Sequence, residues 1–591
     1  MTDSPAKLYP PSAWRVWENP IFRRYTRSRL RMKGLLPGLL LTLILAVFWS
    51  LITPILTERS DEGRQRWRQS MEERAQRSPE HRKMLEQQME WERRGGREWQ
   101  KLDPVMYQRM ALLPLLALQA LILFVIGTGQ VAGGMTMERD EGMVDYQRLA
   151  PMTPLAKTLG YLIGLPVREW VMFAATLPFT ALALWRGQVP FSDWGPVALI
   201  FITSVLLYHL TGLVAGTVFK SRRWAFLLCM AMIFLLYFLV PQGSRLGLPF
   251  LRYVTMWPAL MESSHLLPAH LARDWQMFSA HTPGEGVKFF QWNFSDVAFT
   301  LLVQGSFILT MVVMVWRKWR QADSHLLSKA WALLVFAWLC VLPLGNALPG
   351  IADGSLFPAQ NLRRYVQQDR VDEPTLPEAL LMCGFYGMLM LVLLVLLVIM
   401  LTPAADTQAR GLRRAAKLGK RSAPFFSDAF SAFTVVLVLT MCAAASWGWF
   451  THSVLASKWF HSDPGWWMFA VFFGVLAPAT LGLHALLESR GGKWPFLAIV
   501  FLGAVPLLTA LVVWAASRQL PTTAVLIGGA SPLAQTFYAA EQSVPMTLHD
   551  SAAVLHNSAR TALYVWPALY GAGTILGLIS LNRHWRKMRK R

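Results

Sequence analysis

Charged residues are scarce in this chain of 591 residues, and their scarcity excludes several classes of protein. Asp, Glu, Lys and Arg make up 16% of the sequence, against about 25% in an ordinary soluble domain. Hydrophobic residues reach 54%, which excludes a disordered or collagen-like chain. The net charge of +22 is typical of a nucleic-acid-binding protein, but the chain is too apolar for one. We therefore expect an integral membrane protein with its positive charge on one side, and no nucleic-acid partner.

Cysteine is also rare, and the four cysteines show no metal-binding or disulfide pattern. Cys229, Cys340, Cys383 and Cys442 each lie inside an apolar run, and no CxxC pair occurs. The sequence predicts four small, buried hydrophobic side chains rather than a disulfide framework or a zinc site.

The motifs of common catalytic sites are absent too. Neither HExxH nor GxSxG occurs, and the twelve histidines are scattered, so no metal site is expected. The two Gly-Lys pairs are followed by Arg421 and by Trp494 instead of Ser or Thr, and neither belongs to a phosphate-binding loop. The sequence predicts that the chain is not an enzyme and holds no cofactor.

Long apolar runs dominate the rest of the sequence. A run of about 18 or more uncharged residues can cross a bilayer as a helix. Twelve candidates are Leu35–Leu56, Met110–Thr136, Leu162–Trp185, Gly195–Phe219, Ala225–Val240, Val297–Trp316, Ala330–Leu348, Ala379–Leu401, Ala429–Trp449, Pro464–Leu487, Trp494–Ser517 and Thr561–Leu581. We therefore expect an all-α polytopic membrane protein of about twelve transmembrane helices.

The charges between these runs predict an orientation. Twelve spans place both termini on one side, and that side carries 32 basic and 10 acidic residues. The opposite side carries 24 basic and 23 acidic residues. Because cytoplasmic loops are enriched in Lys and Arg, both termini are predicted to be cytoplasmic.

The order of loops predicts two halves of six spans each, residues 35–320 and 321–591. The first half has an external loop at 57–109, rich in both charges, which is expected to form two polar helices broken around Pro79. A solvated hairpin and a docking surface for an external partner are both compatible with this loop. The short external loop is central in each half, as in a parallel duplication, and the chain ends in a basic cytoplasmic tail.

The cytoplasmic loop at residues 135–160 is the most informative stretch. Four acidic and two basic residues lie between Met137 and Arg148, and an apolar segment with Pro151 and Pro154 follows. We expect a short amphipathic helix, loosened at Gly142 and ended by the two prolines. Such a rigid, charged element could transmit force from a soluble partner, although an ordinary interfacial loop would have the same composition.

In this loop the sequence resembles the permease subunits of ABC-2 type transporters. That family carries Glu-Arg, then Gly with a small or apolar residue, then Leu and Pro, between its second and third spans. The positions that match are Glu138, Arg139, Gly142, Met143, Leu149 and Pro151. Residues 1–34 are similar to the family's interfacial N-terminal helix, through Asn19-Pro20-Ile21 and a stripe of Trp14, Trp17 and Ile21.

The resemblance implies a permease subunit of the bacterial inner membrane that exports a substrate, powered by a separate cytoplasmic ABC ATPase that binds ATP and Mg²⁺. The six matching residues would form the coupling helix against that ATPase. The second half lacks the motif, since its loop at 402–421 is basic except for Asp406. It is either a degenerate repeat or an accessory bundle, which leaves a homodimer or a second permease open. A basic loop of this kind also anchors to anionic membrane lipids.

Two other functions were compatible with the composition. One is a membrane scaffold or anchor protein that binds its partner through residues 57–109. The other is a membrane-embedded lipid-modifying enzyme, which would require a cluster of acids or histidines at the membrane edge.

Four ionisable residues lie within or beside the predicted spans, where such groups are often functional. Arg168 and Glu169 interrupt the third run and are expected to cap an interfacial helix, too far apart around the helix axis for an ion pair. His484 and Glu488 stand four residues apart near the end of the tenth run. They are predicted to form an intramembrane pair, unless Glu488 extends to the interface.

Overall fold

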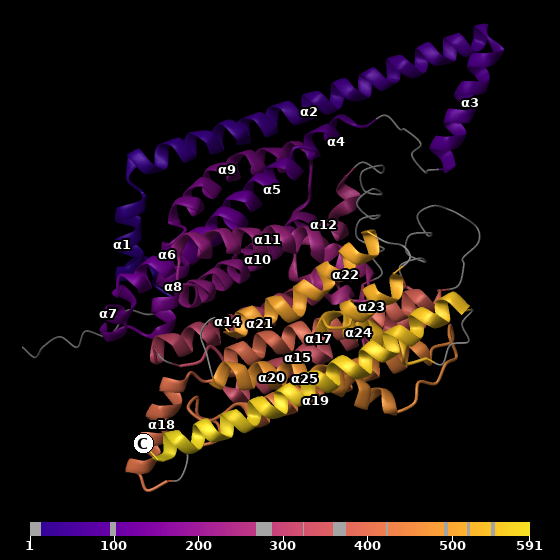
Figure 1. Ribbon diagram of the computed structural model, residues 1–591. Coiled ribbons are helices and arrows are strands. Elements are labelled where there is room, and N and C mark those ends of the chain that lie inside the picture. The colour runs from indigo at the N-terminus through magenta and orange to yellow at the C-terminus, as the bar shows by residue number, and fades with distance from the viewer. Residues whose placement is uncertain are drawn as a thin grey trace, which may run out of the picture.

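The computed structural model is a bundle of long helices that run side by side (Figure 1). It describes residues 14–94, 102–267, 286–322, 324–357, 374–420, 423–489, 494–516, 520–544 and 550–590. The earlier part of the chain forms the upper side of the bundle in Figure 1, and the later part forms the lower side. Helices α1, α7 and α18 and the last residues of α25 all lie at one end, which we call the α7 end.

The helices before residue 268 have these bounds: η1 (Val16–Glu18), α1 (Pro20–Arg29), α2 (Met32–Arg77), α3 (Pro79–Arg94), α4 (Pro104–Arg109), α5 (Leu112–Ala120), η2 (Leu121–Gly127), α6 (Thr128–Asp140), α7 (Met143–Leu149), α8 (Pro154–Gly164), α9 (Val167–Arg186), α10 (Phe191–Val218), α11 (Arg222–Arg245), η3 (Pro249–Val254), α12 (Trp257–Glu262) and η4 (Ser263–Leu266). The segment η2 is a π-helix that joins α5 to α6.

A small antiparallel hairpin follows, with β1 (Val287–Phe289) paired to β2 (Trp292–Phe294). The remaining helices are α14 (Asp296–Arg320), α15 (Lys329–Asp353), α17 (Leu376–Leu401), α18 (Ala405–Lys417), α19 (Phe433–Leu455), α20 (Trp467–Ser489), α21 (Trp494–Ile499), η5 (Val500–Ala504), α22 (Val505–Ala516), α23 (Pro521–Gly528), α24 (Pro532–Glu541) and α25 (Asp550–Lys590). The hairpin lies in a stretch for which the sequence predicted only a loop.

Twelve helical segments in the described residues are long and apolar enough to cross a membrane. This confirms the predicted multi-pass, all-α architecture. The third span begins at Val167, after a break at Leu165 and Pro166 that separates it from α8. Proline lacks the amide hydrogen that would continue the helix, so the apolar run that begins at Leu162 is divided between two helices.

Helix α2 continues far beyond its apolar part. It runs without interruption from Met32 to Arg77, and α3 begins at Pro79 after the extended residue Ser78. The predicted break near Pro79 is therefore present, but the first polar helix and the first span form a single helix. Asp61 joins this helix to α4, because its carboxylate accepts a 2.7 Å hydrogen bond from the Tyr107 hydroxyl.

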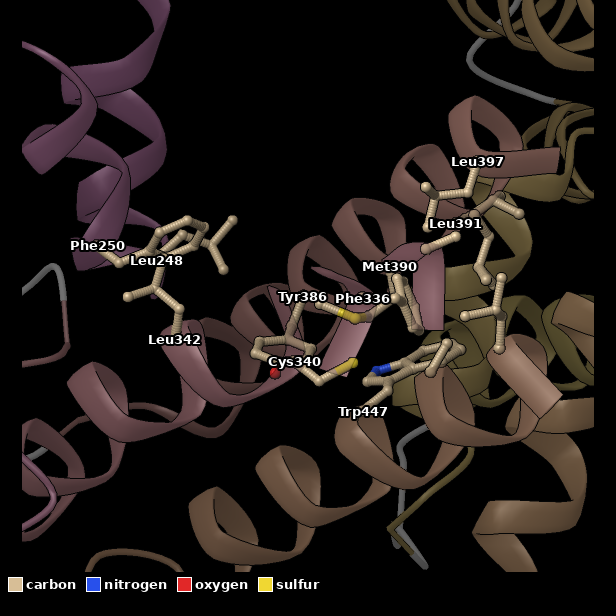
Figure 2. Close-up of a cluster of buried hydrophobic side chains, with 14 of the residues drawn as sticks. Leu248, Phe250, Phe336, Cys340, Leu342, Tyr386, Met390, Leu391, Leu397 and Trp447 are labelled. Carbon is tan, nitrogen blue, oxygen red and sulfur yellow. The ribbon is translucent and has the colours of Figure 1, made fainter. Parts of the chain in front are cut away.

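The largest hydrophobic core joins the two parts of the chain. Leu248 and Phe250, from the segment that contains η3, lie toward Leu342 on α15 in Figure 2. Deeper in the later part, Trp447 on α19 stacks on Phe472 of α20 with 3.8 Å between ring centroids. A second core lies wholly within residues 46–259. Because the larger core crosses from one part to the other, the two parts pack as one body.

One detail of the predicted burial is wrong. Cys229, Cys340 and Cys383 are buried, but Cys442 is exposed. The outer face of a membrane helix contacts lipid tails, which are as apolar as the protein interior. An apolar run therefore does not show whether a residue faces the protein or the lipid.

The predicted aromatic stripe of the N-terminal segment is also divided, because the helix begins after its two tryptophans. Helix α1 begins only at Pro20, with the Asn19 side chain accepting a hydrogen bond from the Ile21 amide. Ile21 is buried in the core, whereas Trp14 and Trp17 precede the helix and are exposed. The three residues therefore do not share one face.

Candidate functional site

The Glu-Arg pair of the resemblance motif lies in the last turn of α6, at the α7 end of the bundle. Glu138 is 1% exposed and forms an ion pair with Arg24 of α1, at 3.0 Å. The Tyr161 hydroxyl of α8 donates a second hydrogen bond to the same carboxylate, at 3.3 Å. Burial, reinforced by the negative charge of Glu138, raises the pKa of Tyr161, so this hydroxyl stays a donor. Glu138 therefore fastens α1 and α8 to the end of α6.

Arg139 joins α6 to α10. Its guanidinium donates hydrogen bonds to the backbone carbonyls of Thr217, at 2.9 Å, and of Phe219. These carbonyls lie at the C-terminal end of α10, where the last turn of a helix leaves its acceptors without intrahelical partners. Arg139 also pairs with Asp140 at 2.9 Å. The motif arginine is therefore a cap for a neighbouring membrane helix.

Gly142 begins α7 rather than loosening a longer helix. Its φ of +73° lies in the left-handed region, and no atom would meet a Cβ placed there. The residue is required by the backbone turn between α6 and α7 and not by crowding. Met137 to Asp140 thus belong to α6, and the predicted single amphipathic helix is two helices separated by this turn.

Helix α7 is short and has one buried and one exposed face. Val144 is 3% exposed and packs in the core, whereas Tyr146 is 69% and Leu149 is 84% exposed. Arg148 pairs with Asp145 and donates a 3.2 Å hydrogen bond to the Lys318 carbonyl on α14. The helix is therefore attached to the bundle on one side and presents Tyr146 and Leu149 outward on the other.

The prolines after α7 have different roles from the predicted ones. Pro151 follows the C-cap of α7 and is exposed, whereas Pro154 is the first residue of α8. Thr153 caps α8 by accepting a hydrogen bond from the Ala156 amide. Lys157 is buried and donates a 3.2 Å hydrogen bond to the Arg148 carbonyl, which ties the end of α7 to α8. Burial, with a smaller effect of Arg148, lowers the pKa of Lys157.

A cavity of about 210 Å³ lies under α7. Its wall combines basic and apolar side chains from α6, α7, α10 and α14. The residues that line it are Met135, Arg139, Val144, Asp145, Arg148, Thr217, Val315, Lys318, Trp319 and Ala322. The cavity therefore lies between α7 and the ends of α6, α10 and α14.

The structure also corrects the interpretation of Arg168 and Glu169. Both lie in the first turn of α9, the third span itself, and not in a separate interfacial helix. They form an ion pair at 2.9 Å, with Glu169 fully buried. Although adjacent Cα–Cβ directions diverge on a helix, the long arginine side chain reaches around to the neighbouring carboxylate.

His484 and Glu488 form the predicted intramembrane pair at 2.9 Å, and both side chains are fully buried. Glu488 also accepts hydrogen bonds from the Gln408 amide of α18 and from the Ser431 hydroxyl, the latter at 2.8 Å. Thr402 hydrogen-bonds the other ring nitrogen of His484 at 2.9 Å. The pair therefore connects α20 with α18 and with the start of α19.

Among the described residues no group of three or more His, Cys, Asp or Glu side chains is placed to hold a metal ion. His265 of the predicted external loop instead pairs with Asp193 at 3.0 Å. The contacts described at the α7 end are ion pairs, as at Glu138, and helix caps, as at Arg139.

Sequence reasoning missed several residues that hold the α7 end together. Arg24 and Glu138 are 114 residues apart, so no local spacing connects them. Arg148 was counted among the charges of the loop, but its contact with the Lys318 carbonyl spans 170 residues. Among these residues, Lys157 has a signal that sequence alone could use, because it is a basic residue at the start of an apolar run.

Comparison of the chain with protein-family models, with curated proteins and with solved structures gives no match.

Proposed function

We propose that this chain is the permease subunit of an ABC-2 type transporter, and that α7 is the element on which a separate ABC ATPase acts. The observation that carries the proposal is the geometry of α7. A seven-residue helix, begun by Gly142 and exposed at Tyr146 and Leu149, follows the second span directly. It lies at the position where the sequence resembles the coupling helix of that family.

The roles within the motif differ from those that the sequence suggested. Glu138 is buried and Arg139 is occupied by backbone carbonyls, so in this conformation neither offers a surface to another protein. We assign the contact to Tyr146, Leu149 and the exposed Pro151. Glu138 and Arg139 are then positioning residues that transmit a displacement of α7.

The hydrogen bonds around α7 support such transmission. Arg148 connects α7 to α14, and Lys157 connects it to α8. Glu138 connects α6 to α1, and Arg139 connects it to α10. Closure of a partner ATPase around ATP and Mg²⁺ would thus displace several membrane helices together, and rigid elements with two packed arrangements are how such switches act.

Orientation and direction belong to the same proposal. The excess of basic residues at the α7 end is the asymmetry expected for the cytoplasmic face of a bacterial inner membrane, with both termini on that side. Export is the direction that the resemblance favours. The loop that corresponds to α7 in the predicted second half contains the basic helix α18 and lacks the motif, so α7 is the single ATPase contact that we assign in each chain.

The experiment is co-purification of the full chain with the ABC ATPase encoded beside it, together with the ATPase rate in proteoliposomes. Tyr146→Ala with Leu149→Ala should weaken association and reduce the stimulated rate at least tenfold. The matched control is Trp185→Ala with Phe191→Ala, two exposed residues near the end of α9 and at the start of α10. This control should retain both the association and the stimulated rate. Unchanged association of the Tyr146 and Leu149 variant would overturn the assignment.

A second candidate, a scaffold, is favoured by one observation. Helix α2 extends through a polar stretch to Arg77 and is followed by α3, so the two helices offer a large polar surface. Deleting residues 62–98 should abolish partner binding by a scaffold. The same deletion should leave ATPase stimulation intact if α7 is the coupling element.

A further inference from the structure

The basic helix α18 presents one face of positive charge. Arg413, Arg414 and Lys417 are exposed, and Lys420 is exposed just after the helix ends. The only acidic residue of α18 is Asp406 in its first turn. The last two turns of α18 therefore contain basic residues and no acidic residue of their own.

The opposite face of α18 is held against the bundle, which fixes the direction of the basic face. Gln408 is fully buried and donates a hydrogen bond to the Glu488 carboxylate of α20. Gly411 lies so close to Ala429 that a Cβ at position 411 would be 2.2 Å from the alanine methyl group. Ala415 is buried on the same side. Gln408, Gly411 and Ala415 follow helical spacing, so the basic residues between them point away from the protein.

Two large apolar side chains are exposed among the residues that follow this helix. Leu418 is 67% exposed and Phe426 is 58% exposed. They belong to the connection between α17, which ends at Leu401, and α19, which begins at Phe433. Exposed apolar groups next to Lys and Arg at the ends of membrane-spanning helices are typical of a segment that lies in the headgroup region of a bilayer.

The C-terminal end of α25 adds further positive charge at the same end of the bundle (Figure 1). Arg583 and Arg586 are exposed there. Helix α25 packs along α20, since the Thr574 hydroxyl donates a 3.0 Å hydrogen bond to the Pro478 carbonyl. Glu488 at the end of α20 accepts a hydrogen bond from Gln408 of α18. Helix α20 therefore contacts both basic segments, α18 and the end of α25.

We propose that α18, with Arg413, Arg414, Lys417 and Lys420, is a docking surface for anionic phospholipid headgroups. The guanidinium and ammonium groups bind headgroup phosphates, and Leu418 and Phe426 enter the adjacent acyl region. The buried contact of Gln408 with Glu488 keeps the basic face turned toward the bilayer surface. This proposal concerns the later part of the chain and does not depend on an ATPase at α7.

A lipid surface fits these observations better than an acidic protein or a nucleic acid. The connection that contains α18 begins and ends at candidate spans, so both of its ends lie close to the bilayer surface. Its exposed apolar groups would be a disadvantage on a surface that binds only polyanions in water. Juxtamembrane clusters of Lys and Arg are attracted to anionic lipid over short distances, with a strength that grows with the number of charges.

The test uses the full chain in phosphatidylcholine vesicles that contain a trace of spin-labelled lipid. The measured quantity is the preference of the protein for spin-labelled phosphatidylglycerol over spin-labelled phosphatidylcholine. Replacing Arg413, Arg414 and Lys417 by Gln should lower this preference about two- to fivefold. A variant that exchanges Lys for Arg and Arg for Lys at these positions keeps the charge and should keep the preference.

The matched control removes equal charge elsewhere. Arg74→Gln, Arg77→Gln and Lys83→Gln change exposed residues of α2 and α3 and should leave the lipid preference unchanged. Unfolding in detergent should have the same midpoint for all variants, which separates lost binding from lost structure. The proposal is overturned if the glutamine variant of α18 keeps the preference, or if the control loses as much. It is also overturned if the glutamine variant binds polyglutamate or DNA more weakly than the original chain while its lipid preference is unchanged.

Discussion

Arg24 and Glu138 form an ion pair across 114 residues of sequence, with 3.0 Å between a guanidinium nitrogen and a carboxylate oxygen. The two side chains differ in exposure, at 42% for Arg24 and 1% for Glu138. The pair therefore combines a buried anion with a cation that water still reaches. It attaches the N-terminal helix α1 to the end of the second span, next to the turn from which α7 begins.

Removing Arg24 should destabilise the protein more than removing the charge of Glu138. Arg24→Ala leaves a buried carboxylate without its cation, and we expect a loss of about 1–3 kcal/mol, below the value for a fully buried pair because Arg24 is half exposed. Glu138→Gln leaves Arg24 able to turn to water and should cost less. The free energy of unfolding in detergent measures both, and a double-mutant cycle gives the coupling.

Arg15→Ala is the control for this comparison, because Arg15 pairs with Glu18 on an exposed turn. A loss no larger than about 1 kcal/mol is expected there. If Arg24→Ala is equally mild, the Arg24–Glu138 pair does not hold α1 in place.

Gly142 should tolerate asparagine better than alanine. The space around its Cβ position is open, so Gly142→Ala tests only the left-handed backbone, at a cost of about 1–2 kcal/mol. Asn adopts this conformation more readily than Ala. Gly63→Ala in the exposed part of α2, which is equally open, should instead stabilise the protein by about 0.5–1 kcal/mol. Thermal unfolding of the three variants decides whether the turn is strained.

The membrane architecture was predictable because bilayer thickness imposes a simple rule on sequence. A helix that crosses the hydrocarbon core needs about 20 apolar residues, and the twelve runs found by that rule correspond to the twelve spans. The rule fails at Pro166, where an apolar run continues while the helix is broken. It also gives no sign of the π-helix η2, in which apolar residues continue through a local change of winding.

The candidate site was predictable in position but not in its contacts. Gly142 and the prolines mark a turn and helix boundaries, because backbone conformation depends on residue type at those positions. The partners of Glu138 and Arg139 are on α1, α8 and α10, and their identity depends on tertiary packing. The motif residues therefore looked like a surface for a partner, although most of their hydrogen bonds are internal.

Lys157 should make the stability of the protein depend on alkaline pH. Burial lowers its pKa from the ordinary value of 10.5, with a smaller effect of Arg148. Between the two pKa values the unfolded state binds more protons than the folded state, so stability rises with pH below 10.5. Lys157→Met should flatten this rise, as measured by unfolding across that range. An unchanged slope would show that the ammonium is well solvated.

Glu488 should contribute far more to stability than a similar carboxylate at the surface. Glu488→Ala removes the acceptor for Gln408, Ser431 and His484 in a fully buried position, and we expect a loss of about 3–5 kcal/mol. Glu541→Ala is the matched control, because Glu541 pairs with His556 at 3.0 Å but is 34% exposed. Its loss should stay within about 1 kcal/mol.

The same experiment separates the hydrogen bonds of Glu488 from the effect of its charge. Glu488→Gln retains an acceptor oxygen while it removes the charge, so it should recover part of the stability that the alanine variant loses. A full recovery would show that the hydrogen bonds of this side chain to Gln408 and Ser431, and not its charge, stabilise the contact. A loss as large as that of Glu488→Ala would instead show that an amide cannot replace the carboxylate as the acceptor for Gln408 and Ser431.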